Sequence, residues 1–238
     1  MPEPVRLAEL MCTRLCHDIA NPLGTLTGML ELAQAQPGTN PPERAIPPKR
    51  QTGAVETTTL ADLAAALEEM EGRLRLLRAA WGGDCRPLDL PRLRGFARCM
   101  PGADRIRLDL SALPHDTVFA PGIGRILINL LLFAPDVLPS GGAFVLAPAD
   151  NTMDDGAAAT GGAILLRLAG PRGAWPACFA GLLADPEAAR AALREPQMVL
   201  APWIALLATH LGVRARLLMP TGRSAGPAPL LLQPRQPG

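Results

Sequence analysis

The sequence predicts an α + α/β protein, in which an antiparallel helical hairpin precedes a small α/β sandwich. Three observations predict it. Two long stretches, near 7–33 and 60–81, carry apolar residues at helical spacing. A proline-rich segment separates them. After residue 82 the pattern changes to shorter elements that alternate between helix and strand. We therefore expect a hairpin domain at 1–82 and an α/β domain at 83–238.

One apolar stripe runs along the first helix, at Met11, Leu15, Ile19, Leu23, Leu26, Leu30 and Ala33. At 100° per residue, His17 lies about 160° from both Leu15 and Ile19, so the spacing predicts that it points to solvent. Its neighbours on that face are small and uncharged, namely Thr13, Asn21, Gly24 and Gly28. We expect this face to give another protein access to an imidazole.

The residues around His17 suit a nucleophilic imidazole. Neutral histidine is a nucleophile near neutral pH, and an attack on phosphorus requires it to lose a proton from its second nitrogen. Asp18 is placed to hold or accept that proton. Asn21, one turn further, could position a water molecule or the phosphoryl oxygens. Pro22 lacks an N–H group and should bend or loosen the helix there.

The second helix carries a heptad pattern, at Leu60, Leu63, Leu67, Met70, Leu74, Leu77 and Trp81. Two helices that each carry such a seam cannot bury both seams against one another. Two copies of the hairpin can, so we expect a homodimer with an intermolecular four-helix bundle. The prolines of 36–52 predict a long loop at the tip of this bundle.

The α/β half is predicted element by element. Helices are expected at 90–100, at 121–137 after a proline start, and at 197–211 before Gly212. Strands are expected at 105–110, 143–147, 163–169, 213–219 and 229–233, with a loose connection at 149–162. This order predicts helices on one face of a mixed sheet.

Composition narrows the functional classes. A net charge of +1 gives no sign of binding to nucleic acid or to an anionic membrane. No apolar run reaches about 18 residues and no signal-peptide core is present, so we expect a soluble cytoplasmic protein. The five cysteines suit free thiols. Cys12, Cys16 and His17 are spaced one residue too widely for haem attachment, and we expect no metal or cofactor on this chain. His115 is expected in a turn, and His210 packed or half-exposed on a helix.

Two motifs resemble a known family. His17-Asp18-Ile19-Ala20-Asn21-Pro22 resembles the H-[DE]-x-x-x-P phosphoacceptor box of histidine kinase dimerisation domains. With the flanking Leu7–Cys16, this stretch is similar to the ChpT-type histidine phosphotransferases of alphaproteobacterial cell-cycle phosphorelays. The stretch from Gly72 to Gly82 is similar to the end of that family's second helix. The resemblance covers about a third of the chain.

The resemblance implies a function. A hybrid kinase's receiver domain would donate a phosphoryl group to His17, and cell-cycle response regulator receivers would accept it. Any Mg²⁺ would come with the receiver, because this chain shows no carboxylate cluster to hold one. Asp18 and Asn21 would assist His17. The receiver would dock on the hairpin at Thr13, Arg14, Gly24, Gly28, Arg75 and Arg78.

The resemblance to kinases ends where ATP would bind. The second half is similar to the kinase ATPase domain in its order of elements, but the N-x-x-x-N-A box is Asn129-Leu-Leu-Leu-Phe133-Ala134. The first glycine box is replaced by Ala169-Gly-Pro-Arg-Gly173, and no second glycine box precedes the last helix. We therefore expect no ATP-dependent activity. An ATP-dependent kinase, a scaffold without enzymatic activity and a receiver phosphatase remain alternatives.

Overall fold

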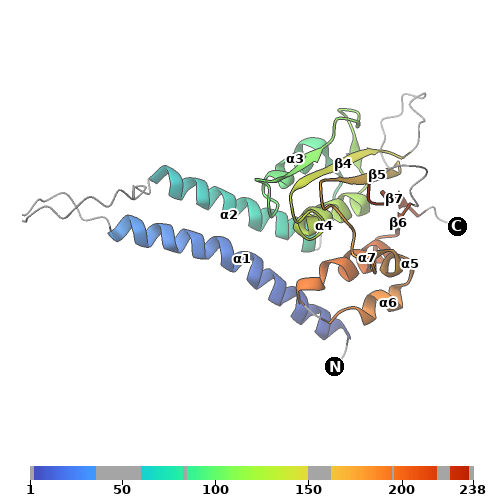
Figure 1. Ribbon diagram of the computed structural model, residues 1–238, viewed down its shortest axis with the longest axis horizontal. Helices are drawn as coiled ribbons and strands as arrows, with labels where there is room; N and C mark the ends of the chain where they lie inside the picture. The colour runs from blue at the N-terminus through green and yellow to red at the C-terminus, as the bar shows by residue number, and fades with distance from the viewer. Residues whose placement is uncertain are drawn as a thin grey trace, which may run out of the picture.

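The computed structural model describes residues 3–35, 60–82, 85–149, 162–194, 196–218 and 226–235. Two long helices project from a compact α/β part (Figure 1). The expected tip loop at 36–52 lies outside the described residues, as does almost all of the expected connection at 149–162. Among the helices that the structure describes, none is long and apolar enough to cross a membrane.

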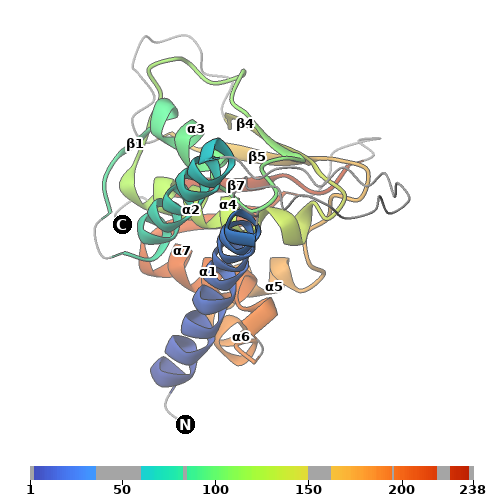
Figure 2. The same cartoon turned by 90° about the vertical axis from the view of Figure 1, so that its left-hand side faces the viewer.

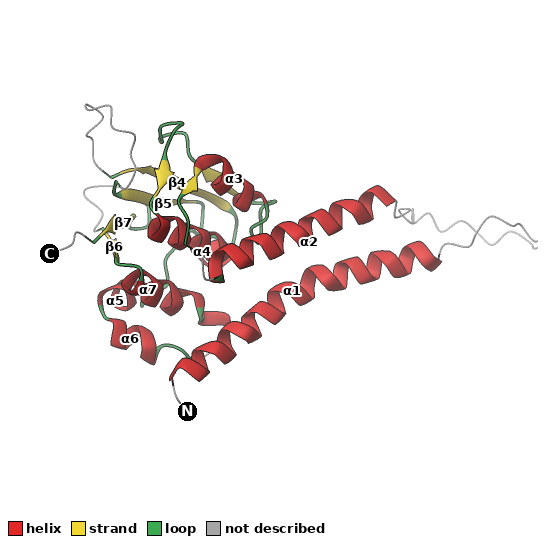
Figure 3. Ribbon diagram, turned by 180° about the vertical axis from the view of Figure 1, so that it is seen from behind, coloured by secondary structure: helices red, strands yellow, loops and turns green. Residues whose placement is uncertain are grey.

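The hairpin consists of α1 (Glu3–Ala35) and α2 (Leu60–Trp81). α1 remains helical through Pro22. Its N-terminal end extends past α2 and runs beside the α/β part, where it contacts η1 (Pro196–Met198) (Figures 1 and 3). Leu10 is 2% exposed there and belongs to the same continuous core as the residues under the sheet. The hairpin and the α/β part therefore share one hydrophobic core.

A five-stranded mixed sheet forms the upper layer of the α/β part in Figure 1. In spatial order its strands are β2 (Ile106–Asp109), β4 (Gly142–Pro148), β5 (Ile164–Ala169), β7 (Leu230–Pro234) and β6 (Val213–Leu217). Among the strands that the structure describes, only β2 and β4 pair in parallel. Alternation along β5 buries Leu166 and Leu168 and exposes Arg167, so one face of the sheet is covered.

Helices cover the inner face of the sheet. α4 (Pro121–Val137) is buried on nearly all sides and contacts α2, α7 (Leu200–His210) and β7. α7 lies against α5 (Phe179–Ala184) and α6 (Pro186–Ala191), as Figure 3 shows. In Figure 2, α2 lies on the α4 side of the hairpin and α1 on the side of α6.

The sequence predicted most of these elements. The helix expected at 121–137 begins and ends at those residues, and the expected strands agree within about two residues. The helix expected at 90–100 is α3 (Leu90–Arg98), and that expected at 197–211 is η1 followed by α7. The small sheet of β1 (Leu88–Asp89) and β3 (Val118–Phe119) was not predicted.

The short helices α5 and α6 were also missed. A sequence signal for α6 was present, because the Asp185 side chain accepts a hydrogen bond from the Glu187 N–H and Pro186 occupies the first helical position. Six residues are too few to show helical periodicity, so only the cap marks such a helix.

The apolar pattern of the hairpin is only partly covered by its own chain. Six leucines in the described parts of α1 and α2 are between 39% and 86% exposed: Leu23, Leu30, Leu32, Leu60, Leu67 and Leu74. In the single chain the stripe expected on α1 is buried only in part: Met11, Leu15 and Ile19 pack against the core, whereas Leu23 and Leu30 lie open. Along α2, Leu77 faces the core, whereas Leu60, Leu67 and Leu74, spaced seven residues apart, face outward.

A buried asparagine joins the hairpin to the α/β part. Asn129 of α4 is 0% exposed. Its Oδ1 accepts hydrogen bonds from Trp81 Nε1 at 3.0 Å and Trp203 Nε1 at 2.9 Å. Its Nδ2 donates to the carbonyl oxygens of Ala80 at 3.1 Å and Arg125 at 2.9 Å. The end of α2, the middle of α4 and α7 are thus tied at one side chain whose hydrogen-bonding capacity is fully used.

We expect Asn129→Leu to lower the free energy of unfolding by about 2–4 kcal/mol, because it leaves the indole N–H groups of Trp81 and Trp203 without their acceptor. Trp203→Phe removes one donor and should cost less, about 1–2 kcal/mol. Urea unfolding followed by circular dichroism measures both, and the cost of Trp203→Phe should shrink in the Asn129→Leu background.

The matched control is Asn21→Leu, which changes an exposed asparagine of α1 and should move stability by no more than about 0.5 kcal/mol. If Asn129→Leu lowered the free energy of unfolding by no more than this control, the hydrogen bonds of Asn129 would not hold the hairpin on the α/β part.

Candidate functional site

His17 lies near the middle of α1 and points to solvent. Its side chain is 71% exposed. Nδ1 lies 3.7 Å from Oδ1 of Asp18, which is longer than a hydrogen bond but close enough for an electrostatic interaction. Nδ1 therefore faces the carboxylate, and Nε2 is the nitrogen left open to an incoming group.

Asp18 is held by Arg14, one turn before it. The Asp18 side chain is 8% exposed, and Arg14 Nε lies 3.3 Å from each of its carboxylate oxygens. Arg14 is itself only 14% exposed. We expected Arg14 to lie on the open docking surface and Asp18 to hold or accept the proton of His17. Instead, the two side chains form a largely buried ion pair behind the histidine.

A second arginine lies close to this pair. Arg73 of α2 donates from a terminal guanidinium nitrogen to the carbonyl oxygen of Cys99, and its buried Nε has no hydrogen-bond partner among the described residues. Burial lowers the pKa of the Arg73 guanidinium, while the Asp18 carboxylate opposes that shift. Asp18 thus pairs with Arg14 of its own helix and interacts electrostatically with Arg73 of α2.

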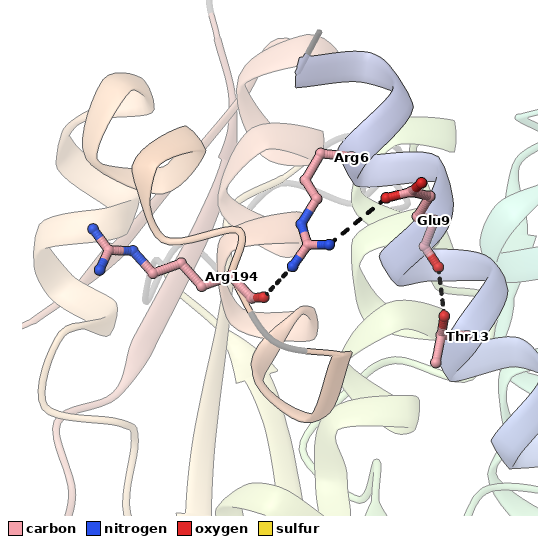
Figure 4. Close-up of polar contacts among 4 residues, drawn as sticks. All are labelled: Arg6, Glu9, Thr13 and Arg194. Atoms are coloured by element: carbon pink, nitrogen blue, oxygen red, sulfur yellow. Dashed lines mark hydrogen bonds and ion pairs between the residues drawn. The ribbon is translucent and has the colours of Figure 1, made fainter. Parts of the chain in front are cut away.

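The helix face around His17 is open. A Cβ atom added at Gly24 or at Gly28 would meet no atom within 4 Å. Asn21 is exposed. The Thr13 hydroxyl donates to the Glu9 carbonyl oxygen at 2.8 Å, which keeps it along the helix (Figure 4). No bulky side chain of this face shields the imidazole.

The N-terminal end of α1 is anchored next to this face. A guanidinium nitrogen of Arg6 donates to the Arg194 carbonyl oxygen at 2.6 Å, and a second one pairs with Glu9 at 3.6 Å (Figure 4). This contact holds α1 against the segment between α6 and α7. It therefore helps to fix the helix on which His17 lies.

The arginines expected on α2 occupy different surroundings. Arg75 and Arg78 are both exposed. Arg75 and Asn21 line one wide cleft of about 1440 Å³ between α1, α2 and α3. Arg78 lies near the end of α2 and is not among the residues lining that cleft. The structure therefore brings Arg75, but not Arg78, into the same cleft as a residue of the His17 face.

The positions that would serve a nucleotide in a kinase are used for packing. Asn129 is fully hydrogen-bonded within the protein, and Phe133 is 3% exposed with its ring centroid 5.9 Å from that of Phe179. The glycine turn after β5 packs on the turn before β4, since a Cβ on Gly170 would lie 2.6 Å from the Gly141 carbonyl oxygen. These groups support the fold.

The remaining candidates are spread apart. His115 is exposed in a turn, as expected. His210 is exposed at the end of α7, so the expectation that it is packed or half-exposed is wrong. Within the described residues, no three His, Cys, Asp or Glu side chains gather as a metal site would require.

Sequence reasoning missed part of the site's support. The spacing of Arg14 and Asp18, four residues apart on a helix, is that of an ion pair and was available as a signal. Nothing in the sequence indicated that Arg73 or Asp136 of α4 would lie close enough to interact electrostatically with Asp18.

The chain matches no protein-family model and none of the curated proteins. Its fold is similar to that of a bacterial phosphotransferase solved at 1.7 Å, with a TM-score of 0.58. The match covers 98% of this chain and 97% of that chain. At 17% sequence identity the likeness is one of fold alone.

Proposed function

We propose that the protein is a histidine phosphotransferase of a phosphorelay, with His17 as the phosphoryl acceptor. The observation that carries this proposal is the exposed imidazole backed by a fixed carboxylate on α1. The likeness of the whole chain to a bacterial phosphotransferase supports a role in phosphoryl transfer. The motifs around His17 and at the end of α2 support the phosphorelay.

In the proposed reaction, His17 Nε2 attacks the phosphorus of a receiver's phosphoaspartate. The N–P bond forms as the P–O bond to the aspartate breaks, and the aspartate leaves as a carboxylate. The phosphoimidazole is positively charged until Nδ1 loses its proton, and the nearby Asp18 carboxylate stabilises this charge. Arg14 keeps Asp18 in place as a positioning residue. The reverse reaction transfers the group to a second receiver.

The open helix face suits the approach of such a receiver. In-line attack needs the reacting atoms within about 3–3.5 Å, so a bulky residue near His17 would hold the two proteins apart. Gly24, Gly28 and Thr13 leave that room, and Arg75 lies across the adjacent cleft. The Mg²⁺ that neutralises the phosphoryl charge would be bound by the receiver's own carboxylates.

The arrangement of α4 supports a role without ATP. A kinase needs side chains free to hold Mg²⁺ and the phosphates, and here the corresponding asparagine is occupied by two tryptophans and two carbonyl groups. Phe133 packs on Phe179 where the second asparagine of that box would stand.

We expect a phosphorylated receiver to label the wild-type protein and not His17→Ala, because among the three histidines, all of which lie in described parts of the chain, only His17 has a carboxylate within ion-pair distance of its imidazole. Receivers from the same genome are phosphorylated and mixed with the protein, and the transferred group is mapped by mass spectrometry under alkaline conditions. His115→Ala and His210→Ala are the matched controls and should retain the label.

ATP replaces the receiver in a parallel reaction, where no label should appear. Label that persisted on His17→Ala would contradict the assignment of the acceptor. Label on His17 from ATP alone would show that the protein is a kinase.

We further propose that two copies of the hairpin form a four-helix bundle. The outward-facing Leu60, Leu67 and Leu74 on α2, with Leu23 and Leu30 on α1, form two rows that the single chain leaves open. Burying one leucine contributes about 1.5–3 kcal/mol, so covering both rows would hold a stable dimer together.

We expect Leu67→Glu to convert the dimer to a monomer, since Leu67 is 53% exposed in one chain and a charge there is costly only in the bundle. Ala65→Glu, about 160° around α2 from Leu67, is the control and should leave the dimer intact. Light scattering measures the mass of each. A monomer for the unmodified protein at micromolar concentration would rule out the bundle.

A further inference from the structure

A largely apolar pocket lies between α4, α5 and α7. Its volume is about 480 Å³, within the range of small-molecule sites in proteins. Its walls are mainly apolar and include Phe133, Pro176, Leu182, Met198 and Pro202. Met198 is 60% exposed, and its flexible side chain can adapt to what enters. The proposed phosphotransfer at His17 makes no use of this pocket.

One carboxylate lines this apolar pocket. Asp136 is the last residue but one of α4, so its negative charge adds to that of the helix's C-terminal carbonyl groups. Asp136 is exposed, and partial desolvation by its neighbours still raises its pKa above the ordinary range. Arg14 opposes this shift and Asp18 reinforces it. A group that brings a positive charge and a hydrogen-bond donor to Asp136 would relieve that cost.

The second charged side chain of the pocket, Arg194, already has a hydrogen-bond acceptor in its own segment. Arg194 lines the pocket, but its Nε donates to the Ala191 carbonyl oxygen at 3.2 Å. Its side chain runs away from α1 in Figure 4, whereas Asp136 interacts with charges of α1. Arg194 is not among the charges that shift the pKa of Asp136, which are those of Arg14 and Asp18.

We propose that this pocket binds a small molecule with an apolar body and one ammonium group, the body against Phe133, Leu182 and Pro202 and the ammonium on Asp136. The bond is an ion pair reinforced by hydrogen bonds, and no covalent step is involved. Such a ligand would come within electrostatic range of Arg14 and Asp18 of α1, which act on Asp136 but do not line the pocket. The proposal does not depend on the function assigned to His17.

Three probes with the same apolar body test it: 2-naphthylmethylamine, 2-naphthylmethanol and 2-naphthoic acid. Calorimetry and ligand-observed NMR with the full chain measure their affinities. We expect the amine to bind saturably, once per chain, and at least ten times more tightly than the alcohol or the acid. In Asp136→Asn its affinity should fall to that of the alcohol.

Three variants complete the test. Asp104→Asn changes an exposed acid outside the pocket and should bind the amine as the wild type does. Ala192→Trp fills the pocket and should remove binding of all three probes while thermal unfolding shows the protein still folded. His17→Ala should bind the amine normally, which separates this inference from the proposed function. The proposal is overturned if no probe saturates, if the three bind equally, or if the preference for the amine survives Asp136→Asn.

Discussion

The side chain of Asn129 carries the connection on which the rest of the structure depends. Its four hydrogen bonds join the last turn of α2 to α4 and α7 in a site without solvent access. Breaking any of these hydrogen bonds would leave a buried polar group without a partner, which is costly. The four bonds therefore hold α2, α4 and α7 in fixed relative positions. Arg125 adds a second donor to the Ala80 carbonyl oxygen. The hairpin is thereby fixed in orientation on the α/β part.

The fixed orientation of the hairpin determines how His17 is presented. With α2 fixed, Arg73 lies close enough to Asp18 to interact with it electrostatically. Arg6 anchors the N-terminal end of α1 to the carbonyl oxygen of Arg194, between α6 and η1. His17 is thus presented on a helix that is held at its end and backed by a buried ion pair. The α/β part serves as a support for α1, and the buried Asn129 and Phe133 of α4 belong to that support.

The elements predicted from the sequence are those marked by apolar periodicity or by residues at their ends. Helix α4 was predicted to the residue because a proline start and a continuous apolar run are local signals. The exposure of His17 followed from helical geometry. The short α5 and α6, the β1–β3 pair and the proximity of Asp136 to Asp18 were not predicted, since each depends on tertiary contacts or on too few residues. Leu23 and Leu30 lie open in the single chain, and the proposed second copy of the hairpin would cover them.

The most direct test of the central claim is ³¹P NMR of the protein treated with phosphoramidate, a small-molecule donor that needs no partner protein. The account predicts one acid-labile phosphohistidine resonance per chain, absent from His17→Ala and unchanged when His115 and His210 are both replaced by alanine. A resonance that remained in His17→Ala, or none in the wild type under conditions that phosphorylate a known histidine phosphotransferase, would contradict it.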